Sequence, residues 1–247
     1  MKPELFLTAT VALLVLLPAT MKASGCGVTA PDALDAVAAA PQTHKVLLEN
    51  DLVRVLEVSL PAGVKEPAHS HVWPALIVED VPRPGAIPEV RNFRYRWEGP
   101  QARDKGGNGA KSAVHYLRME LKKADCQPSK DLTLPPTDGV VIHDPTIKVP
   151  LENQYVRVLE IEVNPGESEP PHTHTWPSIV YYYRLPPSTR GTTDGAPPAV
   201  RPELKQIQVT FDATAQPLHT LLNRGTYLYQ AHRIELKPVT DAPVAKR

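Results

Sequence analysis

Residues 49–77 read ENDLVRVLEVSLPAGVKEPAHSHVWPALI, and residues 152–180 read ENQYVRVLEIEVNPGESEPPHTHTWPSIV. The two stretches align at one constant offset, which places His172 opposite His69, and about half of the aligned positions are identical. Each contains the pattern Gly-x5-His-x-His-x-Trp-Pro. A repeat longer than about 50 residues indicates two copies of a domain and not a solenoid of short units.

Composition sets the class of protein. The chain has 247 residues, enough for two small domains that each bury a core. Its 27 basic and 27 acidic residues balance and form no basic run, which argues against a nucleic-acid partner. The 28 prolines, with only 6% aromatic residues, favour short strands and loops over long helices.

Apolar and polar residues alternate in the opening segment of each copy, 52–60 and 155–163, as they do in a strand with one buried face. A Pro/Gly turn and the histidine segment follow in both copies. Short strands separated by turn signals predict an all-β protein built as a sandwich or barrel. Later strand-like segments are 76–78, 179–183, 207–211 and 228–236.

The copies also share an ending. Residues 118–122 (RMELK) match 233–237 (RIELK) at an offset of 115, against 103 for the histidines, so the second copy carries about twelve extra residues. We expect them in the Pro/Gly/Thr-rich stretch 185–202, as a loop near the rim. The predicted organisation is a signal peptide (1–25), a tether (26–43), a first domain (44–122), a linker (123–142), a second domain (143–238) and a tail (239–247).

The paired histidines suit a metal ion. Residues i and i+2 of a strand point to the same face, so His172 and His174 present two imidazoles to one side, as His69 and His71 do. A catalytic metal typically has three protein ligands and an open position. The third candidate in the second copy is His219.

In the first copy, the offset of 115 places Asp104 opposite His219. Asp can ligate a metal, so we predict a degenerate, weaker site from His69, His71 and Asp104. A polar cavity lined by histidines without a metal is the alternative for both copies.

These motifs resemble those of the cupin superfamily, whose first motif is Gly-x5-His-x-His-x3,4-Glu-x6-Gly and whose second ends Pro-x-Gly-x2-His-x3-Asn. Gly166, His172 and His174 match the first, and His219 with Asn223 matches the end of the second. The resemblance covers about 44–122 and 143–238. It implies two tandem cupin-type jelly-roll barrels, a bicupin, with a metal inside the second.

Two departures from the family pattern matter. The Glu of the first motif is missing in both copies, and the Pro and Gly expected before His219 do not match. Three neutral histidines resemble the sites of some cupin dioxygenases. The cofactor is therefore expected to be a divalent metal ion, Fe, Mn, Zn, Ni or Cu, and its uncompensated charge favours an anionic ligand.

Other side chains are weighed as parts of the site. Trp176 and Tyr182 share the strand face of His174, so they are candidates for substrate binding, with ordinary core packing as the alternative. Arg54 and Arg157 interrupt apolar strand faces, where pairing with a buried carboxylate or clamping an anion would account for them.

The N-terminus reads as an export signal, with Lys2 before an apolar stretch of signal-peptide length. Residues 23–26 (ASGC) resemble a lipoprotein box, in which Cys26 would be lipidated. The alternative is plain secretion, with Cys26 free or paired with Cys126. The expected location is the periplasm or the membrane surface as a lipoprotein, or outside the cell.

Two functions remain open from the sequence. The first is an exported metal-dependent enzyme, dioxygenase-, isomerase- or hydrolase-like, that acts on a small anionic molecule; its catalytic residues are unknown. The second is a non-enzymatic small-molecule-binding or cell-surface scaffold protein built from the same barrels. A membrane tether through the N-terminus and a homodimer are the expected further associations.

Overall fold

The computed structural model describes residues 26–27, 29–81, 91–104, 106–192 and 197–243. The expected signal peptide, residues 1–25, lies outside the described residues. Strands dominate, and the single helix in the described part is α1 (Ala36–Ala39). No helix among these residues has the length and apolar content needed to cross a membrane.

The first barrel consists of a five-stranded antiparallel sheet, β1-β2-β7-β4-β5, and a facing pair, β3-β6. β2 pairs with β7 along its whole length, from Val53 opposite Leu121 to Leu60 opposite Val114. The strands are β1 (His44–Glu49), β2 (Val53–Leu60), β3 (His69–His71), β4 (Ala75–Val81), β5 (Asn92–Glu98), β6 (Gln101–Asp104) and β7 (Val114–Leu121).

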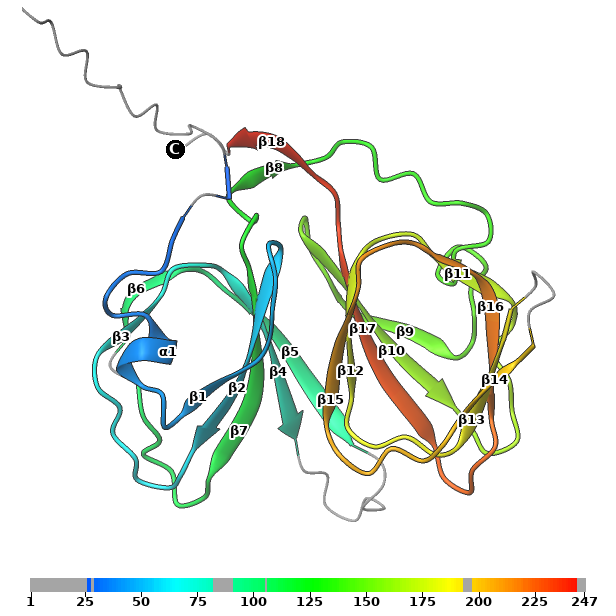
Figure 1. Cartoon of the computed structure of the whole chain (residues 1–247), viewed down its shortest axis with the longest axis horizontal. Coiled ribbons are helices and arrows are strands. Elements are labelled where there is room, and N and C mark those ends of the chain that lie inside the picture. The colour runs from blue at the N-terminus through cyan, green and yellow to red at the C-terminus, as the bar shows by residue number, and fades with distance from the viewer. Residues whose placement is uncertain (1–25, 28, 82–90, 105, 193–196, 244–247) are drawn as a thin grey trace, which may run out of the picture.

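The second barrel repeats this plan with a sheet β15-β12-β17-β10-β9 and a facing sheet β11-β16-β13-β14. β10 pairs with β17 as β2 does with β7. The strands are β9 (Ile147–Glu152), β10 (Val156–Val163), β11 (His172–His174), β12 (Ser178–Tyr182), β13 (Ser188–Thr192), β14 (Ala199–Arg201), β15 (Gln208–Asp212), β16 (Gln216–Asn223) and β17 (Tyr229–Leu236). The predicted all-β fold of two tandem barrels is confirmed (Figure 1).

The extra residues of the second copy form strands, so the expectation of a rim loop over 185–202 was wrong. Ile179 and Phe211 are cross-strand partners 32 positions apart in the sequence. Their counterparts in the first barrel, Leu76 and Trp97, are 21 positions apart. The added chain carries β13 and β14, and β13 pairs with β16 from Ser188 to Thr192. Because these pairings are set by the facing strand, local Pro/Gly/Thr composition did not reveal them.

Three segments expected to lack regular structure also contain elements. The tether 26–43 contains α1, which Asp35 caps by accepting a hydrogen bond from the Val37 N–H. A four-residue helix is too short to leave a helical period in the sequence. β8 (Cys126–Pro128) in the linker 123–142 pairs with β18 (Val239–Pro243) in the tail, and this pair lies above the two barrels (Figure 1).

One hydrophobic cluster joins the barrels. It includes Val55 and Leu76 of the first barrel with Val158 and Ile179 of the second. At its edge the Trp97 and Tyr155 rings stack with centroids 5.7 Å apart. The two large sheets therefore pack face to face through apolar side chains, which fixes the barrels side by side (Figure 1).

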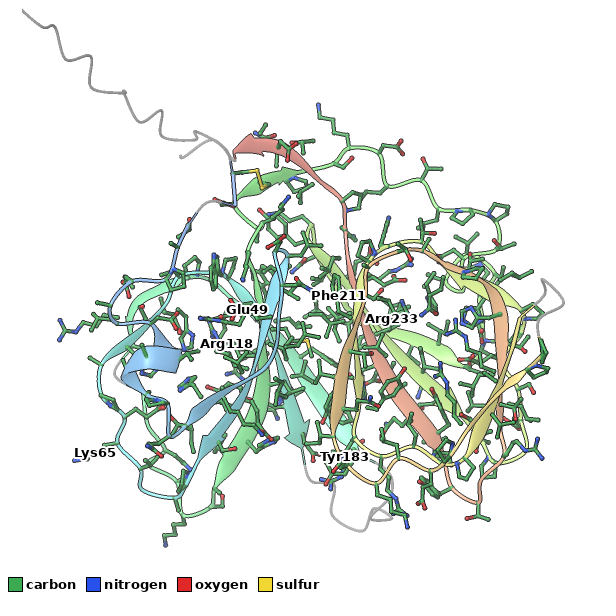
Figure 2. The ribbon with its side chains drawn as sticks, in the orientation of Figure 1. Glu49, Lys65, Arg118, Tyr183, Phe211 and Arg233 are labelled. Carbon is green, nitrogen blue, oxygen red and sulfur yellow. A yellow bond between two sulfur atoms is a disulfide. The ribbon has the colours of Figure 1, made fainter. Side chains whose placement is uncertain are left out.

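Cys26 and Cys126 form a disulfide, drawn in yellow beside β8 in Figure 2. Of the alternatives that the sequence left open for Cys26, the structure has the pairing with Cys126. Lipidation of Cys26 stays a prediction for a form of the chain without this disulfide, because a sulfur in a disulfide cannot also carry a thioether-linked lipid.

Candidate functional site

The structure brings His172, His174 and His219 together inside the second barrel. His172 and His174 lie on β11, and His219 lies opposite His172 on the neighbouring strand β16. All three are buried, and one ring nitrogen of each falls within 4.8 Å of the others. The strand register thus assembles the three predicted ligands.

Two of the three imidazoles are oriented by a hydrogen-bond acceptor at Nδ1. His172 Nδ1 is 2.9 Å from the carbonyl oxygen of Pro170, and His219 Nδ1 is 2.8 Å from that of Pro217. His174 Nδ1 lies 3.3 Å from Glu235 Oε1 without a hydrogen bond between the two atoms. Acceptors at Nδ1 keep the proton there and leave Nε2 free to bind a metal, the usual outer arrangement of metal-binding histidines.

The spacing of the inward nitrogens suits a metal ion. His172 Nε2 and His174 Nε2 are 3.2 Å apart. Two nitrogens that each lie about 2.1 Å from one ion are roughly 3.0–3.4 Å apart in octahedral or tetrahedral geometry. The donor set of three imidazoles accepts Fe, Zn, Ni or Cu. The residues present therefore fit a divalent transition metal.

Protonation favours ligation by two of the three histidines. Burial, helped by the nearby charge of Arg190, lowers the pKa of His219 to about 3. Burial and the charge of Arg233 lower the pKa of His174 well below its ordinary value. For His172, burial is outweighed by the acceptor Asp144 and the charge of Glu169, so its pKa is raised. Metals bind neutral imidazoles, and the lowered pKa values keep His174 and His219 neutral at neutral pH.

The first barrel also contains a triad, with a different third histidine. His69 and His71 on β3 gather with His44, the first residue of β1, and all three are buried. Burial and the neighbouring His71 and His69 lower the pKa of His44 to about 4. Its Nε2 is buried without a hydrogen-bond partner, as expected of a nitrogen that would face an ion.

Asp104 does not complete this triad. It lies opposite His69 in the register, as His219 lies opposite His172, but its carboxylate oxygen is 3.9 Å from His69 Nε2 and its side chain is 36% exposed. Because β6 ends at Asp104, that side chain is left at the rim. His44 takes its place from the opposite sheet. A sequence signal existed, because the counterpart of His44 is the apolar Ile147, paired with Ile161 as His44 is with Val58.

A buried ion-pair chain supports both triads. In the first barrel Arg54 binds Asp35 and Glu120, at 2.7 and 2.6 Å, and Glu120 Oε1 lies 2.8 Å from His71 Nδ1. Burial raises the pKa of Glu120 less than its bonds to His71 and Arg54 lower it, to about 2. The carboxylate is therefore charged and holds the imidazole. This confirms the expectation that Arg54 pairs with buried carboxylates.

The second barrel has the same chain. Arg157 binds Glu235 at 2.5 Å and Asp138 at 3.1 Å. Glu235 Oε1 lies 3.3 Å from His174 Nδ1. The Trp176 ring packs against this ion pair, and the Arg157 guanidinium lies 4.8 Å from the ring centroid. Trp176 thus packs on the ion pair and does not line the cavity described below.

Each unit therefore consists of two facing antiparallel sheets around a His-x-His strand, with a third histidine from another strand. The chain has the fold of two tandem cupin-type barrels. This confirms the predicted resemblance, which rested on the two motifs and their spacing.

Several solved structures are similar to this chain. AerE from Microcystis aeruginosa is 14% identical, with a TM-score of 0.46, over 79% of this chain and 98% of AerE. A cupin domain from Bordetella pertussis is 20% identical, with a TM-score of 0.32, over 37% of this chain and 92% of its own. Salicylate 1,2-dioxygenase from Pseudoaminobacter salicylatoxidans, solved with gentisate, is 8% identical, with a TM-score of 0.41, over 76% and 71%. No protein-family model matches the chain, and no curated protein is significantly similar to it.

A small cavity of about 40 Å³ adjoins the second triad. His174, His219 and Tyr182 line it, so the candidate Tyr182 shares this cavity with two of the three histidines. Ala231 forms part of the wall, and its counterpart in the first barrel is Tyr116, opposite Val58 as Ala231 is opposite Ile161. Tyr116 packs against the cluster of Leu56, Val58 and Leu60, and its ring is much larger than the methyl group of Ala231.

Corresponding glutamates differ between the barrels. Glu66 accepts a hydrogen bond from Thr43 Oγ1 and lies 3.4 Å from His44 Nδ1. In the second barrel the counterpart of that threonine, Thr146, donates to Asp144 instead, at 2.7 Å. Glu169 lines the cavity, where burial raises the pKa of its carboxyl to about 7.

Asn223 of the His-x3-Asn pattern has a structural role. Its Nδ2 donates to the carbonyls of Val163 and Tyr227, both at 2.9 Å. Asn108 does the same in the first barrel, toward Leu60 and Ser112. These hydrogen bonds tie each asparagine to the turn before β7 or β17, and not to the histidine triad of its barrel.

Proposed function

We propose that the protein is an exported bicupin whose second barrel binds one divalent metal ion through His172, His174 and His219 and uses it on a small anionic molecule. The observation that carries this proposal is the set of three histidines next to a cavity. When bound, the metal would supply Lewis-acid or redox chemistry to a ligand in that cavity. Oxygenation, isomerisation and hydrolysis are the reaction classes that we consider.

A second ion is proposed for the first barrel, on His44, His69 and His71. The larger Tyr116 stands there at the position of the cavity-wall residue Ala231, so this ion would stabilise the fold and take no substrate.

Exogenous ligand binding tests the open position in the second barrel. Cobalt(II) replaces the native ion as a coloured probe, and sodium azide is titrated while the visible spectrum is followed. We expect azide to change the spectrum of the wild type and of His44→Ala, and to have no effect on His219→Ala. A spectrum that azide leaves unchanged in the wild type, or an azide effect that survives in His219→Ala, contradicts the proposal.

A non-enzymatic binding protein is the alternative function, and the same barrels would serve it. An open metal position without turnover of any small organic acid supplied to the metal-loaded protein would favour that alternative. A homodimer stays a prediction that sedimentation of the purified protein tests.

Export is supported by the disulfide between Cys26 and Cys126, because disulfides persist in oxidising compartments. Mass spectrometry of the mature protein under non-reducing conditions tests this part. We expect an unlipidated chain, two hydrogens lighter than the fully reduced form. A diacylglycerol mass on Cys26 contradicts it.

A further inference from the structure

The cavity beside the second metal triad has a cationic mouth. Arg190 on β13, Arg201 on β14 and Gln216 on β16 line both the cavity and an outer cleft of about 610 Å³. They therefore form a throat between solvent and the triad. A ligand that moves from the outer cleft to the histidines passes these two guanidinium groups.

The second barrel alone has these arginines, because β13 and β14 are the inserted strands. A third arginine of the cavity, Arg233, is part of the common scaffold. Its counterpart is Arg118 on β7, because Arg118 lies opposite Leu56 as Arg233 lies opposite Leu159, and each pairs with a carboxylate on the edge strand of its sheet, β5 or β15. Arg233 binds Asp212 and Arg118 binds Glu98, both at 2.7 Å. Arg233 is thus already neutralised by the fold.

Arg190 and Arg201 have no such partner among the described residues. Arg190 donates from Nη2 to the neutral amide oxygen of Gln216, at 2.8 Å, and its buried Nε has no hydrogen-bond partner. Glu169 is the one carboxyl group among the residues that line the cavity, against three arginines, Arg190, Arg201 and Arg233. A half-buried guanidinium with a free donor costs free energy unless a ligand completes it.

We propose that Arg190 and Arg201 clamp the carboxylate of a small organic acid in the throat, with its carbon end in the cavity beside His174 and His219. This inference rests on the proposed metal function and names the chemical class of its ligand. The clamp was built by the insertion that distinguishes the second copy. Among the described residues of the first barrel, 29–81, 91–104 and 106–121, no strands correspond to β13 and β14.

Two features favour a carboxylate over an inorganic anion. A guanidinium presents two parallel N–H groups that match the two oxygens of a planar carboxylate. The inner wall beyond the throat is also apolar in part, formed by Ile161, Val180 and Leu221. A short carbon chain buries those side chains, which phosphate cannot do. The inner volume of about 40 Å³ limits that chain to a few carbons.

Propionate is the probe for the test, with propionamide as its neutral isostere and inorganic phosphate as the competing anion. Binding is measured by calorimetry on the metal-loaded and the metal-free protein, with metal content determined for every sample. The variants are Arg190→Gln, Arg201→Gln and, as the matched control, Arg94→Gln on β5, where the arginine side chain is 67% exposed.

We expect propionate to bind the wild type and Arg94→Gln equally, and about 10-fold or more weakly to Arg190→Gln and Arg201→Gln at unchanged metal content. Propionamide should bind the wild type no more tightly than propionate binds the arginine variants. Propionate that binds both arginine variants as tightly as the wild type, or phosphate that binds the wild type more tightly than propionate does, overturns the inference. These results are distinct from failure of the metal proposal, in which the wild type holds no metal and the metal-free protein still reports on the clamp.

Discussion

The two barrels share a scaffold and differ in what it surrounds. Both have the buried chain from Asp to Arg to Glu to His, and both place a His-x-His strand against it. They differ in the strand that supplies the third histidine, in Tyr116 against Ala231, and in the inserted strands β13 and β14. Duplication thus kept the support of the site, while ligand access changed in one copy.

The shared scaffold is tested by removing its central charge. Arg54→Met or Arg157→Met leaves two buried carboxylates without their partner, and each change should lower the free energy of unfolding by about 3–5 kcal/mol. Chemical denaturation of the metal-free protein measures both. If one variant loses less than about 1 kcal/mol while the other loses the full amount, the two scaffolds are not equivalent.

Glu169 gives the second barrel a pH dependence. Its folded pKa, about 7, lies above its ordinary value of 4.5, so the folded state holds a proton that the unfolded state releases. The contribution of Glu169 to the free energy of unfolding is complete below pH 4.5. It is lost as the pH rises to 7, by on the order of 2–3 kcal/mol. Unfolding of the metal-free protein at several pH values should show this loss in the wild type and not in Glu169→Gln. An identical pH slope in the variant contradicts it.

The cavity should close when the first barrel's residue is placed in the second. Ala231→Tyr puts a ring where the wall of the cavity lies and should cost about 1–3 kcal/mol through overpacking. Metal content should stay the same, while the azide effect on the cobalt spectrum disappears. An azide effect of full size in this variant shows that the ligand reaches the metal by another route.

Much of the architecture was readable from the sequence because duplication repeats its own signals. The alternation in 52–60 and 155–163 predicted β2 and β10, and the spacing of His172, His174 and His219 predicted the second triad. Strand periodicity places i and i+2 side chains together without knowledge of the fold.

The features that separate the barrels could not be assigned from local pattern, although His44 differs from its apolar counterpart Ile147. His44 stands before the aligned block and joins its triad only through pairing of β1 across the sheet. Arg190 lies in a segment whose composition resembles a loop, and its strand is defined by a partner 31 positions away, Leu221. Such pairings depend on long-range register, which local pattern does not contain.

Metal stoichiometry tests the central difference most directly, namely that the third ligand comes from β1 in one barrel and from β16 in the other. Metal per chain is measured for the wild type, His44→Ala, Asp104→Ala and His219→Ala after identical loading and desalting. We predict two ions in the wild type and in Asp104→Ala, and one ion in each histidine variant. Loss of an ion from Asp104→Ala with both retained in His44→Ala would contradict the account.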